Sequence, residues 1–345
     1  PDFPTPQPIV DSGIEAISKG NVHYTTALGL PELREAIAGF YTTRYAVNVI
    51  PNRIVITPGA SGALMLALGV IMQEGDEVLL ADPGYPCNKN FVRFLSGKAR
   101  SIPVDATTAY QLTLKHLQDN WTDKISAVMV ASPSNPTGTL LSQEEIIAMA
   151  AFVKEKGAYL IVDEIYHGLV YDTDVNTALE IDKNIIIINS FSKYFNMTGW
   201  RLGWLVAPKE LVDDIDKLAQ NIFLAAPTPA QYAALAAFKP ETIAILESHK
   251  EEFKQRRDYL LPELKKLGFK IEVEPQGAFY IYANCEKFTN DSYKFAYDLL
   301  ENIGVAITPG KDFGENEANS FVRFAYTTSI EQLEEAIKRL TTYLA

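Results

Sequence analysis

Lys193 is the first residue whose type and position could do chemistry. It ends the segment 190–193, which directly follows an apolar, strand-like run at 184–189. A lysine just beyond the carboxyl end of a strand lies where open α/β sheets bind ligands. If burial lowers the pKa of its amine from about 10.4, that amine can attack a carbonyl group and form an imine. The alternative is an ordinary solvated lysine.

A carboxylate and a phenol follow another apolar run. Asp163 closes the run 159–162, and Tyr166 comes three residues later. A carboxylate at the end of a buried strand needs a partner. A ring N–H group would provide one, and the carboxylate would keep that ring protonated and electron-withdrawing. One turn could bring the Tyr166 hydroxyl to the same side, where it could hold a phenolate oxygen. The alternatives are a helix cap or ion pair for Asp163 and core packing for Tyr166.

Two features could bind a phosphate group. Gly59, Ala60 and Ser61 join a strand to a helix, where free backbone N–H groups and the helix dipole favour an anion. This turn has neither the lysine of a P-loop nor the spacing of a dinucleotide fingerprint. Arg201, eight residues after Lys193, could pair with the same phosphate in bidentate geometry.

Two further polar residues could bind a substrate. Asn135 lies in a turn at 132–138 that two prolines and a glycine make rigid. Arg323 lies in the apolar strand-like run 321–326 and needs an anion, for which a carboxylate is the natural match. A simple loop and an internal ion pair are the respective alternatives.

The elements that must position these residues alternate between strands and helices. We predict strands at 53–57, 77–81, 124–131, 158–162, 184–189 and 202–207, with helices at 62–72 and from 142 to about 157. In the second of these helices, Ser142 should cap the first turn and Glu145 should reach back to complete a capping box. Apolar strands that alternate with helices indicate an α/β fold, with a mainly parallel sheet sandwiched by helices.

The pattern changes after about residue 238. We predict a long charged helix at 241–267, strands at 269–273, 278–282, 305–308 and 321–326, a helix at 291–302, and a last helix capped by Ser329. This looser order predicts a smaller α+β C-terminal domain. We therefore divide the chain into a large domain at 15–238 and a small domain at 239–345, with residues 1–14 packing near the small one.

Composition limits the classes of function. The 345 residues carry a net charge of −12, which makes nucleic acid an improbable partner. Two cysteines in a chain of this size favour a reducing, cytoplasmic compartment, and no stretch approaches the length of a membrane span. The four histidines show no metal-ligand spacing. Because the chain opens without methionine, we expect a leading segment to precede it.

Seven motifs occur in the order found in one enzyme family. They lie at 21–25, 29–34, 82–86, 134–138, 163–166, 190–193 and 199–203. Together they resemble the class I and II aminotransferases, enzymes of amino acid metabolism that bind pyridoxal 5'-phosphate (PLP) on the aspartate aminotransferase-like fold type I. The resemblance covers nearly the whole chain. It implies the PLP fold type I large domain, a homodimer with shared active sites, and transfer of an amino group from an L-amino acid to a 2-oxo acid.

The resemblance also implies a role for each matching residue. Lys193 would form the internal aldimine of a ping-pong mechanism and then move protons as general acid and base. Asp163 would pair with the pyridine nitrogen, Asn135 and Tyr166 with the phenolic oxygen, and Tyr85 with the ring face. The phosphate would be bound by Gly59, Ala60, Ser61, Ser190, Ser192 and Arg201, and by Tyr24 from the partner subunit. Arg323 would bind the substrate α-carboxylate, and Asn135 would also contribute to substrate binding.

Other functions could use the same scaffold. A PLP-dependent carbon–sulfur β-lyase would keep every one of these roles and differ in the bond that breaks. The aminotransferase-like sensor domain of a transcription regulator is a second alternative, although no basic winged-helix domain is present. Some relatives with acidic substrates have a lysine at the position of Ser61. We therefore expect apolar or aromatic substrates, with glutamate and 2-oxoglutarate as the exchange pair.

Overall fold

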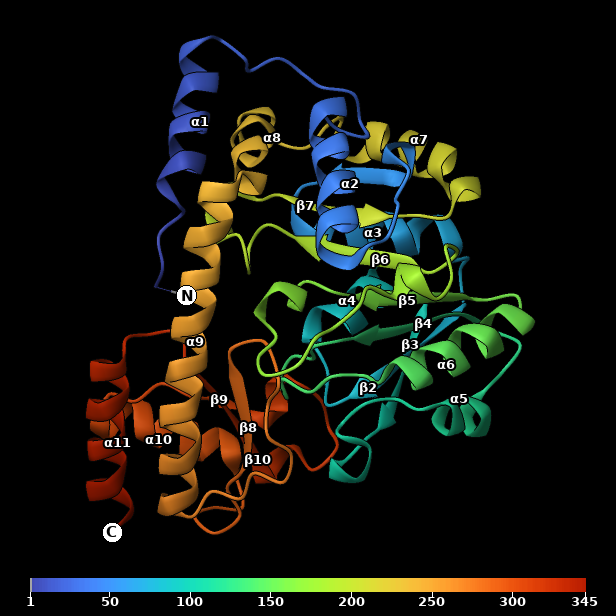
Figure 1. Ribbon diagram of the computed structural model, residues 1–345. Coiled ribbons are helices and arrows are strands. Elements are labelled where there is room, and N and C mark those ends of the chain that lie inside the picture. Colours follow the sequence, from blue (N-terminus) through green and yellow to red (C-terminus); the bar gives the residue numbers. More distant parts are fainter. Residues whose placement is uncertain (1) are drawn as a thin grey trace.

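A seven-stranded sheet forms the centre of the computed structural model, which describes residues 2–345 (Figure 1). The strands run in the order β1 (Ile54–Thr57), β7 (Gly203–Val206), β6 (Ile186–Ser190), β5 (Tyr159–Asp163), β4 (Ile125–Ala131), β2 (Glu77–Asp82) and β3 (Lys98–Pro103). All neighbours from β6 to β3 pair in parallel, whereas β7 is antiparallel to both β6 and β1. The predicted mainly parallel α/β sheet is confirmed.

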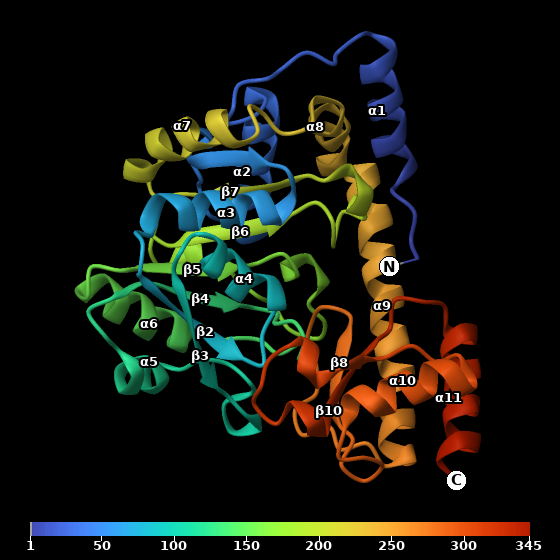
Figure 2. The same ribbon diagram turned by 180° about the vertical axis from the view of Figure 1, so that it is seen from behind.

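Helices cover both faces of this sheet because successive strand residues point to opposite sides. Val128 and Val130 of β4 belong to one core, and Met129 belongs to the other. The first core packs against α2 (Pro31–Tyr45), α5 (Leu114–Asn120), α6 (Gln143–Glu155) and α8 (Thr228–Leu235). The second core packs against α3 (Gly59–Ile71), α4 (Pro86–Phe94) and α7 (Val212–Ile222), which lie in front of the sheet in Figure 2. Both faces are therefore buried, as a parallel sheet requires.

A second, smaller sheet lies nearer the C-terminus. Its order is β8 (Tyr280–Asn284), β10 (Phe321–Ala325) and β9 (Thr308–Pro309), and all pairs are antiparallel. It is accompanied by α10 (Ser292–Ile303) and α11 (Ile330–Leu344). The long helix α9 (Pro240–Leu267) runs from the region of the large sheet to that of the small one (Figures 1 and 2).

The predicted domain boundaries stay a prediction. The large sheet uses residues between 54 and 206, the small sheet uses residues between 280 and 325, and α9 extends between them. Within the first 14 residues, Asp2 pairs with Arg256 of α9 and Phe3 stacks on His249, whereas α1 (Gln7–Ser18) packs against α8. Pro1 lies outside the described residues.

Short 3-10 turns complete the chain, at Pro51–Arg53, Ala106–Thr108, His167–Leu169, Ala178–Glu180, Thr198–Trp200, Lys209–Leu211, Ala236–Phe238, Gly310–Asp312 and Ala318–Ser320. Among residues 2–345, no helix is long and apolar enough to cross a membrane.

Three local predictions were wrong. The segment 269–273 forms only an isolated bridge between Lys270 and Asn284, and the strand expected at 305–308 is reduced to β9. The alternating apolar residues of 269–273 are buried on one side of the segment, but the segment does not pair with a neighbouring strand beyond that bridge. Ser142 does cap α6, by accepting a hydrogen bond from the Glu145 N–H (3.2 Å), but the Glu145 carboxylate accepts from the backbone of Leu114 (2.8 Å) instead of completing a capping box.

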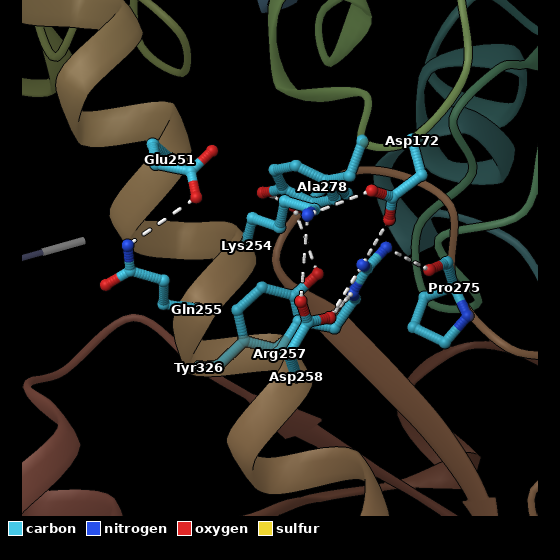
Figure 3. Close-up of polar contacts among 10 residues, drawn as sticks. Asp172, Glu251, Lys254, Gln255, Arg257, Asp258, Pro275, Ala278 and Tyr326 are labelled. Atoms are coloured by element: carbon cyan, nitrogen blue, oxygen red, sulfur yellow. Dashed lines mark hydrogen bonds and ion pairs between the residues drawn. The ribbon is translucent and has the colours of Figure 1, made fainter.

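A polar cluster ties α9 to the segment that leads into β8 (Figure 3). Arg257 of α9 donates to the carbonyl of Pro275 (3.3 Å) and pairs with Asp172 and Asp258. Lys254 lies one turn earlier and also pairs with Asp172 (3.0 Å). Side chains of the helix therefore hold the chain just ahead of the small sheet.

Candidate active site

Most of the candidate residues meet at the carboxyl edge of the large sheet. Because β4, β5 and β6 are parallel neighbours in register, the chain leaves all three strands at one edge. Asp163 ends β5, and Lys193 follows β6 by three residues. The turn that holds Asn135 follows β4.

Lys193 lies in a largely buried, aromatic environment. Its Nζ is 5.5 Å from the ring centroid of Tyr166 and 5.6 Å from that of Phe279. Burial lowers the pKa of the Lys193 amine, the negative charge of Asp163 opposes this shift, and the charges of Arg323 and Arg201 reinforce it. A lowered pKa enlarges the fraction of neutral amine, which is the form that acts as nucleophile and base.

Asp163 is a buried carboxylate, with only 5% of the residue exposed. Burial raises its pKa to about 6, although a hydrogen bond from the Ile165 N–H (3.1 Å) and the charge of Lys193 favour the ionised form. No ion pair to Asp163 occurs within 4.0 Å among residues 2–345, so the group is free to meet an N–H donor.

The carboxylate of the next residue has a structural role. Glu164 accepts hydrogen bonds from the Thr177 hydroxyl (2.9 Å) and the Ala178 N–H (2.8 Å), and His167 Nδ1 lies 3.5 Å away. Burial raises the pKa of Glu164 to about 8 and lowers that of His167 to about 3. These bonds hold the turn that follows Asp163.

The turn between β1 and α3 brings Gly59 against Arg201. Gly59 begins α3 with φ +70°, and a Cβ placed on it would lie 2.5 Å from a guanidinium nitrogen of Arg201. The reason is topological: Gly203 begins β7 and pairs with Thr57 at the end of β1. Arg201, two residues before β7, therefore lies against the N-terminus of α3. A helix N-terminus favours the binding of anions.

The other candidate phosphate ligands lie around this turn. Ala60 is partly buried, and Ser61 is exposed on the first turn of α3. Ser190 and Ser192 are buried, and the Ser190 hydroxyl accepts a hydrogen bond from the Ser192 N–H (3.0 Å).

Asn135 and Arg323 form a direct contact between the two sheets. Arg323 donates to the Asn135 side-chain oxygen (2.7 Å) and to the Thr308 hydroxyl (3.3 Å). Its guanidinium carbon lies 4.1 Å from the ring centroid of Tyr280 and 4.8 Å from that of Phe313. The buried Nε of Arg323 has no hydrogen-bond partner among the described residues. No carboxylate of the described chain pairs with this arginine, so the internal ion pair considered from the sequence is not formed.

Tyr166 is almost fully buried and meets Tyr280. The two hydroxyl oxygens are 3.0 Å apart, and the rings pack edge to face. Burial raises the pKa of both phenols, so both keep their protons near neutral pH.

Tyr85 lines a cavity of about 520 Å³ that borders the candidate site. Tyr85 is 36% exposed, and burial raises the pKa of its hydroxyl. Tyr85 and Asn135 line the cavity, which continues along α4 past Lys89 and Arg93 and does not include Lys193.

Tyr24 is the one candidate that stands apart. It lies between α1 and α2, is 82% exposed, and has no hydrogen bond to another candidate in the described chain. A role in the partner's site, as the resemblance implies, would require such exposure.

Sequence reasoning missed Phe279 and Tyr280. The run that contains them predicts only a strand, and nothing in that pattern shows that the strand faces Lys193 and Tyr166. Glycines that permit close approach, such as Gly203, were noticed only as part of a motif. Among residues 2–345, no cluster of potential metal ligands occurs, and Cys87 and Cys285 are free thiols.

The fold and this group of residues are those of one class of enzyme, and comparison with known proteins identifies the class. Residues 1–340 match the family model "Aminotransferase class I and II". The chain belongs to this family.

Relatives agree over the whole chain. It is 42% identical to the (5-formylfuran-3-yl)methyl phosphate transaminase of Methanocaldococcus jannaschii and 39% identical to the valine–pyruvate aminotransferase of Mycobacterium tuberculosis; each alignment covers 100% of this chain and 89% of the relative. A crystal structure of an aminotransferase from Mycobacterium tuberculosis has a TM-score of 0.96 at 39% identity, covering 100% of this chain and 89% of that one. Aspartate aminotransferase from Thermus thermophilus with maleate has a TM-score of 0.94 at 32% identity, covering 99% and 89%.

These comparisons show that the protein is an aminotransferase with fold type I. Aminotransferases of this class use PLP and act on amino and oxo acids. The β-lyase and the sensor domain, which the sequence left open, are not favoured.

Proposed function

We propose that this aminotransferase binds PLP at Lys193 and moves an amino group between an L-amino acid and a 2-oxo acid in two half-reactions. The observation that supports this most is the pair of buried groups at the sheet edge. Lys193 has a lowered pKa, and Asp163 is a nearby carboxylate without an ion-pair partner among residues 2–345.

The residues present fit the cofactor at each of its polar groups. The N-terminus of α3 at Gly59, together with Arg201, would hold the phosphate, because the positive φ and close guanidinium leave a cradle that a Cβ would fill. Asp163 would hold the ring nitrogen. Asn135 and Tyr166 would hold the phenolic oxygen.

When bound, PLP supplies an aldehyde for imine formation and a protonated ring that withdraws electrons from the substrate carbon. Asp163 would keep the ring nitrogen protonated. Arg323 would bind the substrate carboxylate and so fix the direction of the Cα–H bond. Once the substrate amine has displaced it, the Lys193 amine would be free to take the Cα proton as a general base and to return a proton as a general acid.

Substrate choice and assembly complete the proposal. Relatives named for valine–pyruvate, aspartate and a furanyl phosphate substrate are 34–42% identical to this chain. Sequence similarity to these relatives therefore does not identify the amino acid that donates the amino group. We propose an apolar or aromatic amino acid as donor, with glutamate and 2-oxoglutarate as the exchange pair. We also propose a homodimer in which the exposed Tyr24 of each subunit reaches the other's phosphate.

The test is the absorbance of the purified protein reconstituted with PLP. We expect a visible band that glutamate converts to a shorter-wavelength form, which 2-oxo acids then reverse. Lys193→Ala should abolish the visible band of the lysine-linked cofactor, because no amine remains at that position.

Lys209→Ala is the matched control, since Lys209 is exposed and forms no ion pair among the described residues. It should leave the spectrum unchanged. A wild-type visible band that persists in Lys193→Ala would contradict the assignment of Lys193.

A further inference from the structure

Two hydrogen bonds join the large and small sheets at the candidate site. Asn135, after β4, accepts from Arg323 of β10 (2.7 Å), and the Tyr166 hydroxyl lies 3.0 Å from that of Tyr280 in β8. The Arg323 guanidinium stacks on the Tyr280 ring at 4.1 Å. The four residues therefore form a continuous chain of contacts from Asn135 through Arg323 and Tyr280 to Tyr166, and Tyr280 is the member to which the sequence assigns no role.

Tyr280 is held firmly in this place. It is the first residue of β8, is 6% exposed, and pairs in register with Ala325 of β10. Two residues earlier, the Ala278 carbonyl accepts hydrogen bonds from the hydroxyls of Tyr171 (2.6 Å) and Tyr326 (3.3 Å). Side chains from two segments far apart in the sequence therefore hold the backbone that presents Tyr280.

We propose that Tyr280 is a positioning residue for this transaminase. Its hydroxyl donates to Tyr166, and its ring seats Arg323. The inference rests on the proposed function, in which Tyr166 binds the phenolic oxygen of the cofactor and Arg323 binds the substrate carboxylate.

The direction of the hydrogen bond follows from counting protons. Each phenol has one proton. If Tyr166 donates its proton to the cofactor oxygen, the bond between the two tyrosines must be made by the Tyr280 proton. Such a chain strengthens the Tyr166 donor, because hydrogen bonds in series polarise one another. It stabilises negative charge on the cofactor oxygen, and this makes the neighbouring linkage nitrogen less basic.

The hydroxyl and the ring of Tyr280 therefore have separate effects. Tyr280→Phe removes the donor and keeps the stacking surface. We expect the pH midpoint of the visible band of the lysine-linked cofactor to rise by about 0.5 unit, with the KM for glutamate changing less than about twofold. Tyr280→Leu removes the aromatic face as well and should raise the KM for glutamate about fivefold, the range expected for a lost cation–π contact.

The experiment is a spectrophotometric pH titration of the PLP-loaded protein, followed by steady-state kinetics. Tyr282→Phe is the matched control: Tyr282 lies two residues along β8, is buried, and stacks on Phe321 (4.7 Å) without contacting Tyr166. It should leave both the midpoint and the KM at wild-type values.

The outcomes separate the two proposals. A wild-type protein that shows no visible band with PLP would overturn the proposed function itself. A normal wild-type band whose midpoint is the same in Tyr280→Phe and Tyr282→Phe would overturn the role of the Tyr280 hydroxyl alone. A KM in Tyr280→Leu that equals that of Tyr280→Phe would overturn the role of the ring.

Discussion

At the scale of single residues, Asp163 carries an ionisable group where burial opposes ionisation. Its pKa is raised to about 6, mainly by burial, from an ordinary value near 3.8. A raised carboxyl pKa stabilises the fold below the unfolded pKa, and this contribution is lost as the pH rises through the folded pKa. In the cofactor-free protein, Asp163 should therefore destabilise the fold above about pH 6.

We expect Asp163→Asn to stabilise the cofactor-free protein at pH 8. The amide is neutral and can still accept the hydrogen bond from the Ile165 N–H. The gain should be about 1–3 kcal/mol at pH 8 and about a third of that at pH 4.5, or a rise in Tm of about 2–5 °C at pH 8. Thermal melts of the PLP-free protein at the two pH values provide the measurement.

Asp123→Asn is the control for this variant, because Asp123 is exposed and has no ion pair among residues 2–345. Its Tm should match wild type at both pH values. With PLP added, the sign should reverse for Asp163→Asn, since the proposed partner of the carboxylate is then present. A stabilisation of equal size at pH 4.5 and pH 8 would show that the pKa of Asp163 is the same in the folded and unfolded protein, and that burial does not raise it.

At the scale of elements, the candidate phosphate turn depends on the packing of one strand against one helix. Gly203 begins β7, and a Cβ added there would lie 2.6 Å from the carbonyl carbon of Gly59 and 2.7 Å from the Ala60 nitrogen. These are backbone atoms at the start of α3, which cannot move without changing the whole first turn. The glycine is required by this close approach.

Gly203→Ala should therefore displace the first turn of α3. We expect a loss of about 1–3 kcal/mol of stability, as for overpacking in a buried site, and a PLP affinity reduced by about tenfold or more, because the backbone N–H groups would no longer converge. Thermal melts and equilibrium PLP titration measure the two effects.

Gly199→Ala tests the specificity of this effect within the same motif. An added Cβ at Gly199 would meet no atom within 4 Å. Its stability and PLP affinity should stay close to wild type. If both alanine variants bind PLP as wild type does, the contact between β7 and α3 does not shape the phosphate site.

The same scale shows how far the sequence could predict the molecule. The apolar runs that form β4, β5 and β6 predict a parallel sheet. A parallel sheet brings Asp163, Lys193 and the turn that holds Asn135 to one edge. The edge strand β3 was not predicted, because its half-exposed residues lack an apolar alternation. The strand predicted at 269–273 is absent for the opposite reason. Its apolar alternation reflects burial of one side of the segment, and the segment has no strand partner beyond one bridge.

Contacts between the two sheets were out of reach of sequence reasoning. The bonds from Asn135 to Arg323 and from Tyr166 to Tyr280 join residues 188 and 114 positions apart. No local pattern encodes which face of β8 or β10 meets the large sheet. Arg323 was found because an arginine in an apolar run needs an anion, whereas a tyrosine in such a run needs no explanation.

At the scale of the whole molecule, side chains of α9 hold the segment that precedes the small sheet. Arg257 of this helix is largely buried and donates to the Pro275 carbonyl, while it also pairs with the half-exposed Asp172 (Figure 3). Loss of this side chain would leave a buried carbonyl without that donor, and this costs more free energy of unfolding than losing a surface ion pair.

We expect Arg257→Leu to lower the free energy of unfolding by about 2 kcal/mol, mostly from the unsatisfied Pro275 carbonyl and the loss of packing by the arginine stem. Lys265→Gln is the matched control, because Lys265 lies on the same helix and pairs with the neighbouring Glu274 at the surface. The control should change stability by less than about 0.5 kcal/mol. Urea unfolding of both variants checks this, and equal effects would show that the Arg257 cluster stabilises the molecule no more than an exposed ion pair.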